Sequence, residues 1–201
     1  LHKSEDGGQT WRKVTKGLPE VHLGRIGLAV APSEPDTHYA VIEASQEKGG
    51  FFRSTDEGES WEKMSDHTAQ GQYYNEIYCD PKDVDRVYSM DTWLHVTEDG
   101  GKTFTRVGEK TKHVDNHAMW IDPGNPKHLV LGNDGGLDVS YDQGDTWEFV
   151  NTIAVGQFYA IGVDMRKPYY VCGGLQDNGS FCGPSATRTN QGIVNADWFR
   201  V

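Results

Sequence analysis

The 201-residue sequence has little of what marks several large classes of protein. No stretch approaches the ~20 consecutive apolar residues of a membrane-spanning helix, so we expect no membrane span. Lys and Arg number 19 against 30 Asp and Glu, which gives a net charge of −11. Nucleic acids and anionic membranes favour clustered positive charge, so this balance argues against both as partners. Apolar residues also lack helical periodicity, which argues against an α-helical protein.

Cysteine is scarce as well, with three residues in the chain. Cys172 and Cys182 flank a predicted hairpin tip at residues 175–179, where they could pair across the turn or remain two separate thiols. Cys79 lies in an apolar segment and is expected to be a buried thiol. We expect neither a cofactor nor a bound metal. The chain has no initiator methionine and no signal peptide, and we interpret it as a piece of a longer protein.

What the sequence does contain is one eight-residue pattern in four copies, S/T-x-D-x-G-x-S/T-W/F. The copies begin at Ser4, Ser54, Thr97 and Ser140, so the repeat length lies between 43 and 50 residues. A period of this length with a turn motif in each unit is typical of a β-propeller.

The residue types of the pattern suit a turn that holds itself together. The Asp carboxylate can accept hydrogen bonds from its own turn, the Gly can take a positive φ, and the aromatic residue provides an apolar anchor at the next strand. We therefore interpret these residues as structural, and neither catalytic nor calcium-binding. They are Asp6, Asp56, Asp99 and Asp142; Gly8, Gly58, Gly101 and Gly144; and Trp11, Trp61, Phe104 and Trp147.

Each repeat also contains four short apolar segments, as at residues 75–80, 87–90, 94–96 and 104–107. Four strands per repeat make one propeller blade. We predict an all-β chain in which residues 1–201 form part of one propeller built of four-stranded antiparallel blades. It contains the outer strand of one blade, three full blades over about residues 15–150 and a degenerate blade over about 151–201. The decayed pattern lies at 179–185, and residues 186–195 show no strand pattern.

Loops that differ between repeats gather on the face opposite the repeated turns, where propellers usually bind ligands. Two groups are rich in His, Asp, Asn and Gln. In the first, His113, Asp115 and His117 alternate and would share one face of an extended segment. We expect one polar, acidic cluster about the size of a ligand pocket, formed by His113, Asp115, Asn116, His117, Asn133, Asp134, Gln176, Asp177 and Asn178.

Several roles remain open for this cluster. Two of Asp115, Asp134, Asp177, Asp91 and Glu76 could form the carboxylate pair of a glycosidase. The first histidine group with Asp134 could hold a metal, although we favour simple hydrogen bonding at a strand entrance. The acidic tips could equally be ordinary hairpin turns. Aromatic residues that could stack on a sugar are Trp93, Trp120, Tyr73, Tyr74 and Tyr159, although Trp120 is expected to pack between blades.

The repeated pattern, together with the runs at 117–123, 132–136 and 173–179, resembles the Asp-box or BNR-repeat propellers of secreted bacterial proteins. These proteins are often labelled sortilin-like or BNR-repeat glycosyl hydrolases. The resemblance spans residues 4 to about 200 and implies an exported chain, in the extracellular space or the periplasm. It transfers no catalytic residue, since the arginine triad and tyrosine nucleophile of sialidases have no counterpart here. We expect a scaffold that binds a glycan or a protein, completed by further blades of the parent or of a partner chain. The alternative is a glycoside hydrolase.

Overall fold

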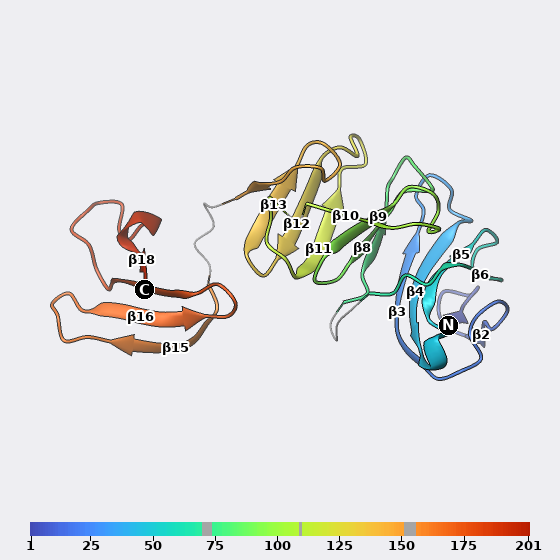
Figure 1. The fold of residues 1–201 in the computed structure, drawn as a ribbon, viewed down its shortest axis with the longest axis horizontal. Coiled ribbons are helices and arrows are strands. Elements are labelled where there is room, and N and C mark those ends of the chain that lie inside the picture. Colours follow the sequence, from blue (N-terminus) through green and yellow to red (C-terminus); the bar gives the residue numbers. More distant parts are fainter. Residues whose placement is uncertain (70–73, 109, 151–155) are drawn as a thin grey trace.

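The computed structural model describes residues 1–69, 74–108, 110–150 and 156–201. These residues form a nearly all-β chain, arranged as a series of small antiparallel sheets (Figure 1). The described segments contain two short 3-10 turns, η1 (Ser45–Glu47) and η2 (Asn195–Asp197). None of their helices is long and apolar enough to cross a membrane.

The chain begins with a two-stranded N-terminal hairpin and continues through four sheets, each with its strands in chain order. The N-terminal hairpin pairs β1 (His2–Lys3) with β2 (Arg12–Lys13). Sheet 1 contains β3 (Leu23–Val30), β4 (His38–Ala44), β5 (Gly50–Ser54) and β6 (Glu62–Ser65). Sheet 2 contains β7 (Ile77–Cys79), β8 (Val87–Met90), β9 (Leu94–Thr97) and β10 (Thr105–Val107).

Sheet 3 contains β11 (Asn116–Ile121), β12 (Leu129–Asn133), β13 (Gly136–Ser140) and β14 (Glu148–Phe149). Sheet 4 contains β15 (Phe158–Val163), β16 (Tyr170–Leu175), β17 (Ser180–Pro184) and β18 (Phe199–Arg200). This succession of four-stranded sheets is the partial propeller that the repeat length predicts.

Among the described residues, three apolar cores lie between the N-terminal hairpin and sheet 3, one at each boundary. The two side-chain sets of a sheet lie on opposite faces, so one set can contact the unit before it and the other the unit after it. The core between the hairpin and sheet 1 contains Val14, Leu18, Ala40, Ile42, Phe52 and Trp61. The core between sheets 1 and 2 contains Ala31, Tyr39, Val41, Phe51, Ile77, Cys79 and Val87. The core between sheets 2 and 3 contains Tyr88, Met90, Leu94, Val96, Met119, Leu129, Leu131 and Trp147.

The four repeated turns have the same hydrogen bonds. In the turn from Ser140 to Trp147, the Ser140 hydroxyl donates to Asp142 (2.8 Å) and accepts from the Gly144 amide (2.9 Å). Asp142 also accepts from the amide (2.9 Å) and hydroxyl (2.6 Å) of Thr146. Gly144 has a φ of 97°, a conformation that side chains rarely adopt. The equivalent bonds recur around Asp6, Asp56 and Asp99.

In three of the four turns, the closing aromatic residue packs back onto the preceding unit. Trp61 lies in the core with the N-terminal hairpin, Phe104 packs against the core with sheet 1, and Trp147 lies in the core with sheet 2. The indole N–H of Trp147 donates to the carbonyl of Gly144 (2.9 Å), so its burial leaves no donor unpaired. Each of these three turns therefore anchors its own sheet to its predecessor.

Sheet 4 differs from the sequence-based expectation at its outer edge. The sequence analysis named no strand after the decayed pattern at 179–185, but β18 pairs with β17 through Phe181–Arg200 and Cys182–Phe199. Trp198, which precedes β18, has the position that Trp147 has before β14, because both strands pair in the same register. A tryptophan is thus present at the equivalent position, at the end of a longer and less regular connection.

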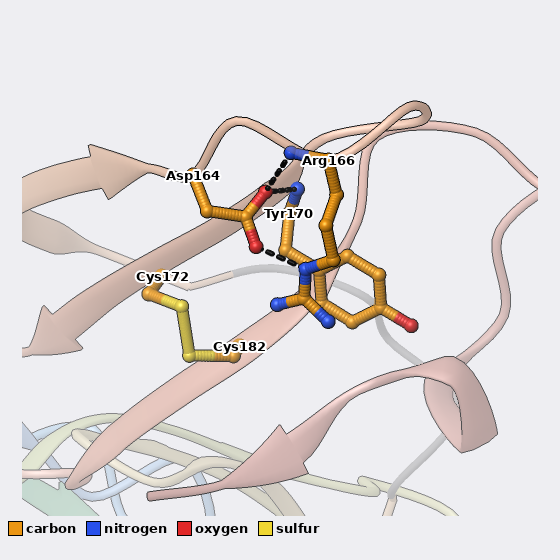
Figure 2. Close-up of a disulfide and its surroundings, with 5 residues drawn as sticks. All are labelled: Asp164, Arg166, Tyr170, Cys172 and Cys182. Carbon is orange, nitrogen blue, oxygen red and sulfur yellow. Dashed lines mark hydrogen bonds and ion pairs between the residues drawn. A yellow bond between two sulfur atoms is a disulfide. The ribbon is translucent and has the colours of Figure 1, made fainter.

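The interior of sheet 4 is joined by a disulfide between Cys172 and Cys182, which face each other on β16 and β17 (Figure 2). At the nearby turn, Asp164 accepts hydrogen bonds from the amides of Arg166 (3.1 Å) and Tyr170 (2.9 Å). The Arg166 guanidinium lies over the Tyr170 ring and pairs with Asp164. Cys79 is a buried free thiol, and burial raises its pKa to about 12.

The hydrogen bonds of the repeated turns predict an acid-dependent stability. The hydroxyl and amide of Thr103 lower the pKa of Asp99 to about 2. A carboxylate with a depressed folded pKa stabilises the fold above its unfolded value of about 4, and this contribution disappears as the pH falls to about 2. Asp99→Ala should lower the free energy of unfolding at pH 7 by roughly 1 kcal/mol. The difference from wild type should shrink across that window in urea titrations, whereas Asp145→Ala, at an exposed position of an equivalent turn, should have little effect. An undiminished difference at pH 2 would contradict the assignment.

Candidate ligand pocket

A pocket of about 920 Å³ lies between the tips of sheets 3 and 4, on the side opposite the repeated turns. Its walls come from the start of β11, the turn between β12 and β13, and the turn between β16 and β17. Seven of the nine residues expected to cluster line it or its rim. The lining consists of Tyr74, Asp115, His117, Asn133, Asp134, Gly135, Gly136, Gly156, Gln157, Leu175, Gln176, Asp177, Asn178 and Phe181.

His117 and Asp134 form the first polar pair of the pocket. His117 Nε2 lies 2.7 Å from Asp134 Oδ1, and the ring stacks beside Tyr74 with centroids 5.5 Å apart. The backbone explains this orientation, because the β11–β12 register shifts between Asn116 and Ala118 and leaves His117 at a bulge. A one-residue bulge removes a side chain from the regular alternation of a strand.

Asp115 and Tyr74 form the second pair. The Tyr74 hydroxyl donates to Asp115 Oδ1 over 2.7 Å. Burial, followed by this bond to a carboxylate, raises the pKa of Tyr74. Asp115 has a φ of 60°, and its backbone binds the carbonyl of Thr92 and the amide of Asp134. Asp tolerates this left-handed conformation better than most residues, so the backbone and the carboxylate are fixed together.

The turn that presents Asp134 depends on two residues beneath it. The Asn133 side-chain oxygen accepts from the amides of Gly135 (2.9 Å) and Gly136 (3.1 Å), while its amide group donates to Asp138 Oδ2 (2.6 Å). Asp138 is completely buried on β13. The sequence analysis missed Asp138, because its position between the apolar Leu137 and Val139 is typical of the exposed face of a strand.

Sheet 4 supplies the opposite wall through Gln176, Asp177 and Asn178. The Asn178 amide group donates to the carbonyls of Asp134 (2.6 Å) and Gln176 (3.0 Å), which joins the two walls. Asp177 has a φ of 56°, the same type of backbone conformation as Asp115. The pocket thus combines carboxylates, amides and one aromatic pair from sheet 3, sheet 4 and the segment that precedes β7 of sheet 2.

Two of the expected residues lie outside this lining. Asn116 is buried and donates to the carbonyls of Asp91 (3.0 Å) and Thr92 (3.3 Å), while Lys112 donates to its oxygen (2.6 Å). His113 contacts the carbonyl of Val114 with Nδ1 (2.9 Å). The expectation that His113, Asp115 and His117 share one face is therefore wrong, because the left-handed Asp115 and the bulge at His117 interrupt the alternation.

The other carboxylate and aromatic candidates lie elsewhere. Asp91 is buried and accepts from the amide of Trp93 (2.6 Å), and Glu76 lines a separate cavity of about 460 Å³ with Arg25. Trp120 is half exposed beside His128, which differs from the expected packing between blades. Tyr73 lies outside the described residues. Within the described segments, no three His, Cys, Asp or Glu side chains are arranged to hold a metal ion.

Comparisons with solved structures identify the architecture as a β-propeller. The GH74 xyloglucanase of Xanthomonas campestris matches 91% of this chain and 33% of its own, with a TM-score of 0.56 and 16% identity. The Niastella koreensis GH74 enzyme matches 87% of this chain and 29% of its own, with a TM-score of 0.54 and 16% identity. YCF48 bound to D1 peptide matches 99% of this chain and 59% of its own, with a TM-score of 0.53 and 14% identity.

Sequence comparison adds one short match. An oligoxyloglucan-reducing end-specific xyloglucanase of Emericella nidulans is 39% identical over 64 residues, which are 32% of this chain and 8% of the fungal protein. No family model matches the sequence. The chain thus spans less than a tenth of this relative and about a third of the two GH74 structures.

The Asn133–Asp138 contact predicts how the pocket turn is stabilised. Asn133→Ala removes the donor to a buried carboxylate and the acceptor for two amides, and should lower the free energy of unfolding by about 2–3 kcal/mol. Asn133→Ala/Asp138→Ala should recover part of this loss, because the unpaired buried charge is then gone. Urea unfolding of both variants, together with Asp138→Ala, gives the coupling between the two residues. Additive losses would show that the contact does not support the turn.

Proposed function

We propose that the chain is part of a β-propeller scaffold that binds a glycan in the pocket between sheets 3 and 4. The observation that carries the proposal is the convergence of Asp115, Asp134 and Asn178 with the stacked Tyr74–His117 pair in one cavity. Carboxylate and amide oxygens accept hydrogen bonds from sugar hydroxyls, and an aromatic ring can contact the apolar face of a sugar. The xyloglucanases among the similar proteins support xyloglucan oligosaccharides as the first ligand to test.

Hydrolysis of such a glycan is the second candidate function. It is supported by the presence of two carboxylates, Asp115 and Asp134, in the same pocket. A glycosidase requires one carboxyl group to donate a proton to the leaving oxygen. Here Asp115 Oδ1 accepts from the Tyr74 hydroxyl and Asp134 Oδ1 contacts His117 Nε2, so both carboxyl groups already have partners within the protein. Binding is therefore the function that this geometry supports better.

We further propose that the chain works in an oxidising compartment outside the cytoplasm, which the Cys172–Cys182 disulfide supports. We also propose that further blades, of the parent chain or of a partner chain, complete the propeller.

Calorimetric titration with xyloglucan oligosaccharides tests the binding proposal. Asp134→Asn and Tyr74→Phe should each weaken binding by about tenfold or more, because each loses a hydrogen bond that involves a carboxylate. Glu62→Gln, at an exposed position on β6, is the matched control and should bind as wild type does.

The same samples distinguish the alternatives. Release of reducing ends by wild type, abolished in both Asp115→Asn and Asp134→Asn, would establish hydrolysis in place of simple binding. Absence of binding to the glycan, or equal affinity of the pocket variants and the control, would overturn the proposal. Binding of a peptide in place of the glycan would overturn its choice of ligand.

A further inference from the structure

Sheet 4 lacks the turn that closes each of the other three sheets. In sheets 1 to 3 the third strand runs into a repeated turn held by Asp56, Asp99 or Asp142. After β17 the corresponding stretch, residues 179–185, contains no Asp, and β18 begins only at Phe199. Sheet 4 is therefore without the carboxylate that fixes this end of the other sheets through hydrogen bonds.

Sheet 4 also buries little apolar surface of its own. None of its described residues belongs to the three apolar cores. β15 is exposed along its whole length and β16 is half-buried, and within the four strands burial is confined to Cys182, Gly183 and Pro184. A small unit with so little apolar burial depends on a covalent cross-link for its order. The disulfide between Cys172 and Cys182 provides that cross-link (Figure 2).

The cross-link lies close to the wall that sheet 4 contributes to the pocket. Cys172 and Cys182 face each other across β16 and β17, and the ladder has two more pairs between them and the tip. Each of those pairs has a glycine on β16, Gly173 or Gly174, so neither can form a side-chain contact across the strands. The tip at residues 176–178 then lines the pocket. The disulfide is thus the last pair before the tip in which both residues have a side chain.

We infer that the Cys172–Cys182 disulfide places the pocket under redox control, because it holds the sheet 4 wall in place only in the oxidised chain. The Asn178 amide group joins this wall to the carbonyl of Asp134 over 2.6 Å, and this contact is lost when the tip is released. The sheet 3 wall remains, because Asn133 holds the Asp134 turn from within sheet 3. Reduction therefore removes one wall of the pocket and leaves the other.

The reductant that this step requires is a dithiol. One of its thiolates attacks the sulfur of Cys172, which is half-buried, whereas Cys182 is buried. The bond between the protein sulfurs breaks, Cys182 leaves as a thiolate, and the reductant is joined to Cys172 as a mixed disulfide. The second thiol of the reductant then displaces Cys172. Each protein sulfur takes up one proton, so the protein ends with two thiols and the reductant with a disulfide.

Hydrogen exchange tests the release of the wall without any ligand. Amides of residues 170–184 should exchange on the order of tenfold or more faster in dithiothreitol than in the oxidised protein, because the cross-link no longer opposes opening. Amides of β12 and β13 should be unchanged. Protection of residues 170–184 that survives reduction, or an equal acceleration in β12 and β13, would overturn the inference.

The matched control is Cys172→Val/Cys182→Val, which keeps apolar side chains at both positions without a disulfide. It should exchange fast at residues 170–184 with or without dithiothreitol. Slow exchange in this variant would show that packing of the two side chains, and not the covalent bond, holds the wall. That result would also overturn the inference.

Ligand titration tests the consequence for the pocket, and this part rests on the proposed function. Affinity for xyloglucan oligosaccharides should fall by about tenfold or more on reduction and return when the disulfide forms again. Release of the wall with unchanged affinity would overturn redox control and leave the proposed function intact. Absence of binding to the oxidised protein would overturn the proposed function and with it the control of affinity, whereas hydrogen exchange tests the position of the wall independently.

Discussion

The structure depends on one recurring interaction, the packing of a turn's aromatic residue against the sheet that precedes it. Trp61, Phe104 and Trp147 each end a turn that is held by its own Asp, and each contributes to the boundary with the previous unit. The hydrogen bonds of the turn fix the backbone, and the backbone fixes the direction of the ring. Because the same geometry recurs in every repeat, stability accumulates between neighbours along the series, as in other repeat proteins.

The repeated turns lie on one face of the series of sheets, and loops that differ from repeat to repeat lie on the other face. The repeated turns use their carboxylates internally, where both oxygens of Asp142 accept hydrogen bonds from the turn itself. The loops at the other ends of the strands do not contain this turn motif. Their residues Asp115 and Asp134 line a pocket. A rigid series of sheets with variable loops is a common basis for ligand recognition. The fold alone does not specify what the pocket binds.

Much of the architecture could be predicted from the sequence, because its chemistry is local. The S/T-x-D-x-G-x-S/T-W/F pattern predicts the turn, and its Gly predicts a positive φ at that position. The spacing between copies of the pattern predicts one four-stranded sheet per repeat. The sequence also indicated where these loops meet. Successive strands of a blade run in opposite directions, which places Asp115, Asp134 and the 176–178 tip on the same face of the series. The details were less accessible. The sequence analysis expected both Asn116 and His117 in the cluster, but with the bulge at His117 only His117 lines the pocket and Asn116 is buried. A shift of one residue reverses a strand's faces.

Residues whose roles arise from tertiary packing were the hardest to predict. Asp138 looks like an ordinary strand carboxylate, and only the packing of sheet 3 shows that it is buried beneath the Asn133 turn. β18 was missed because an irregular connection separates it from β17 and hides the equivalence of Trp198 and Trp147.

The most direct test of the aromatic anchor compares the same substitution in two copies of the turn. Trp147 is buried against sheet 2, whereas Trp11 is exposed and has no preceding sheet among the described residues. In urea unfolding, Trp147→Ala should lower the free energy of unfolding by about 3–5 kcal/mol. Trp11→Ala should lower it by less than about 1 kcal/mol, because little apolar area returns to water. Equal losses for the two variants would show that the aromatic residue stabilises its own turn, and would contradict anchoring to the preceding sheet.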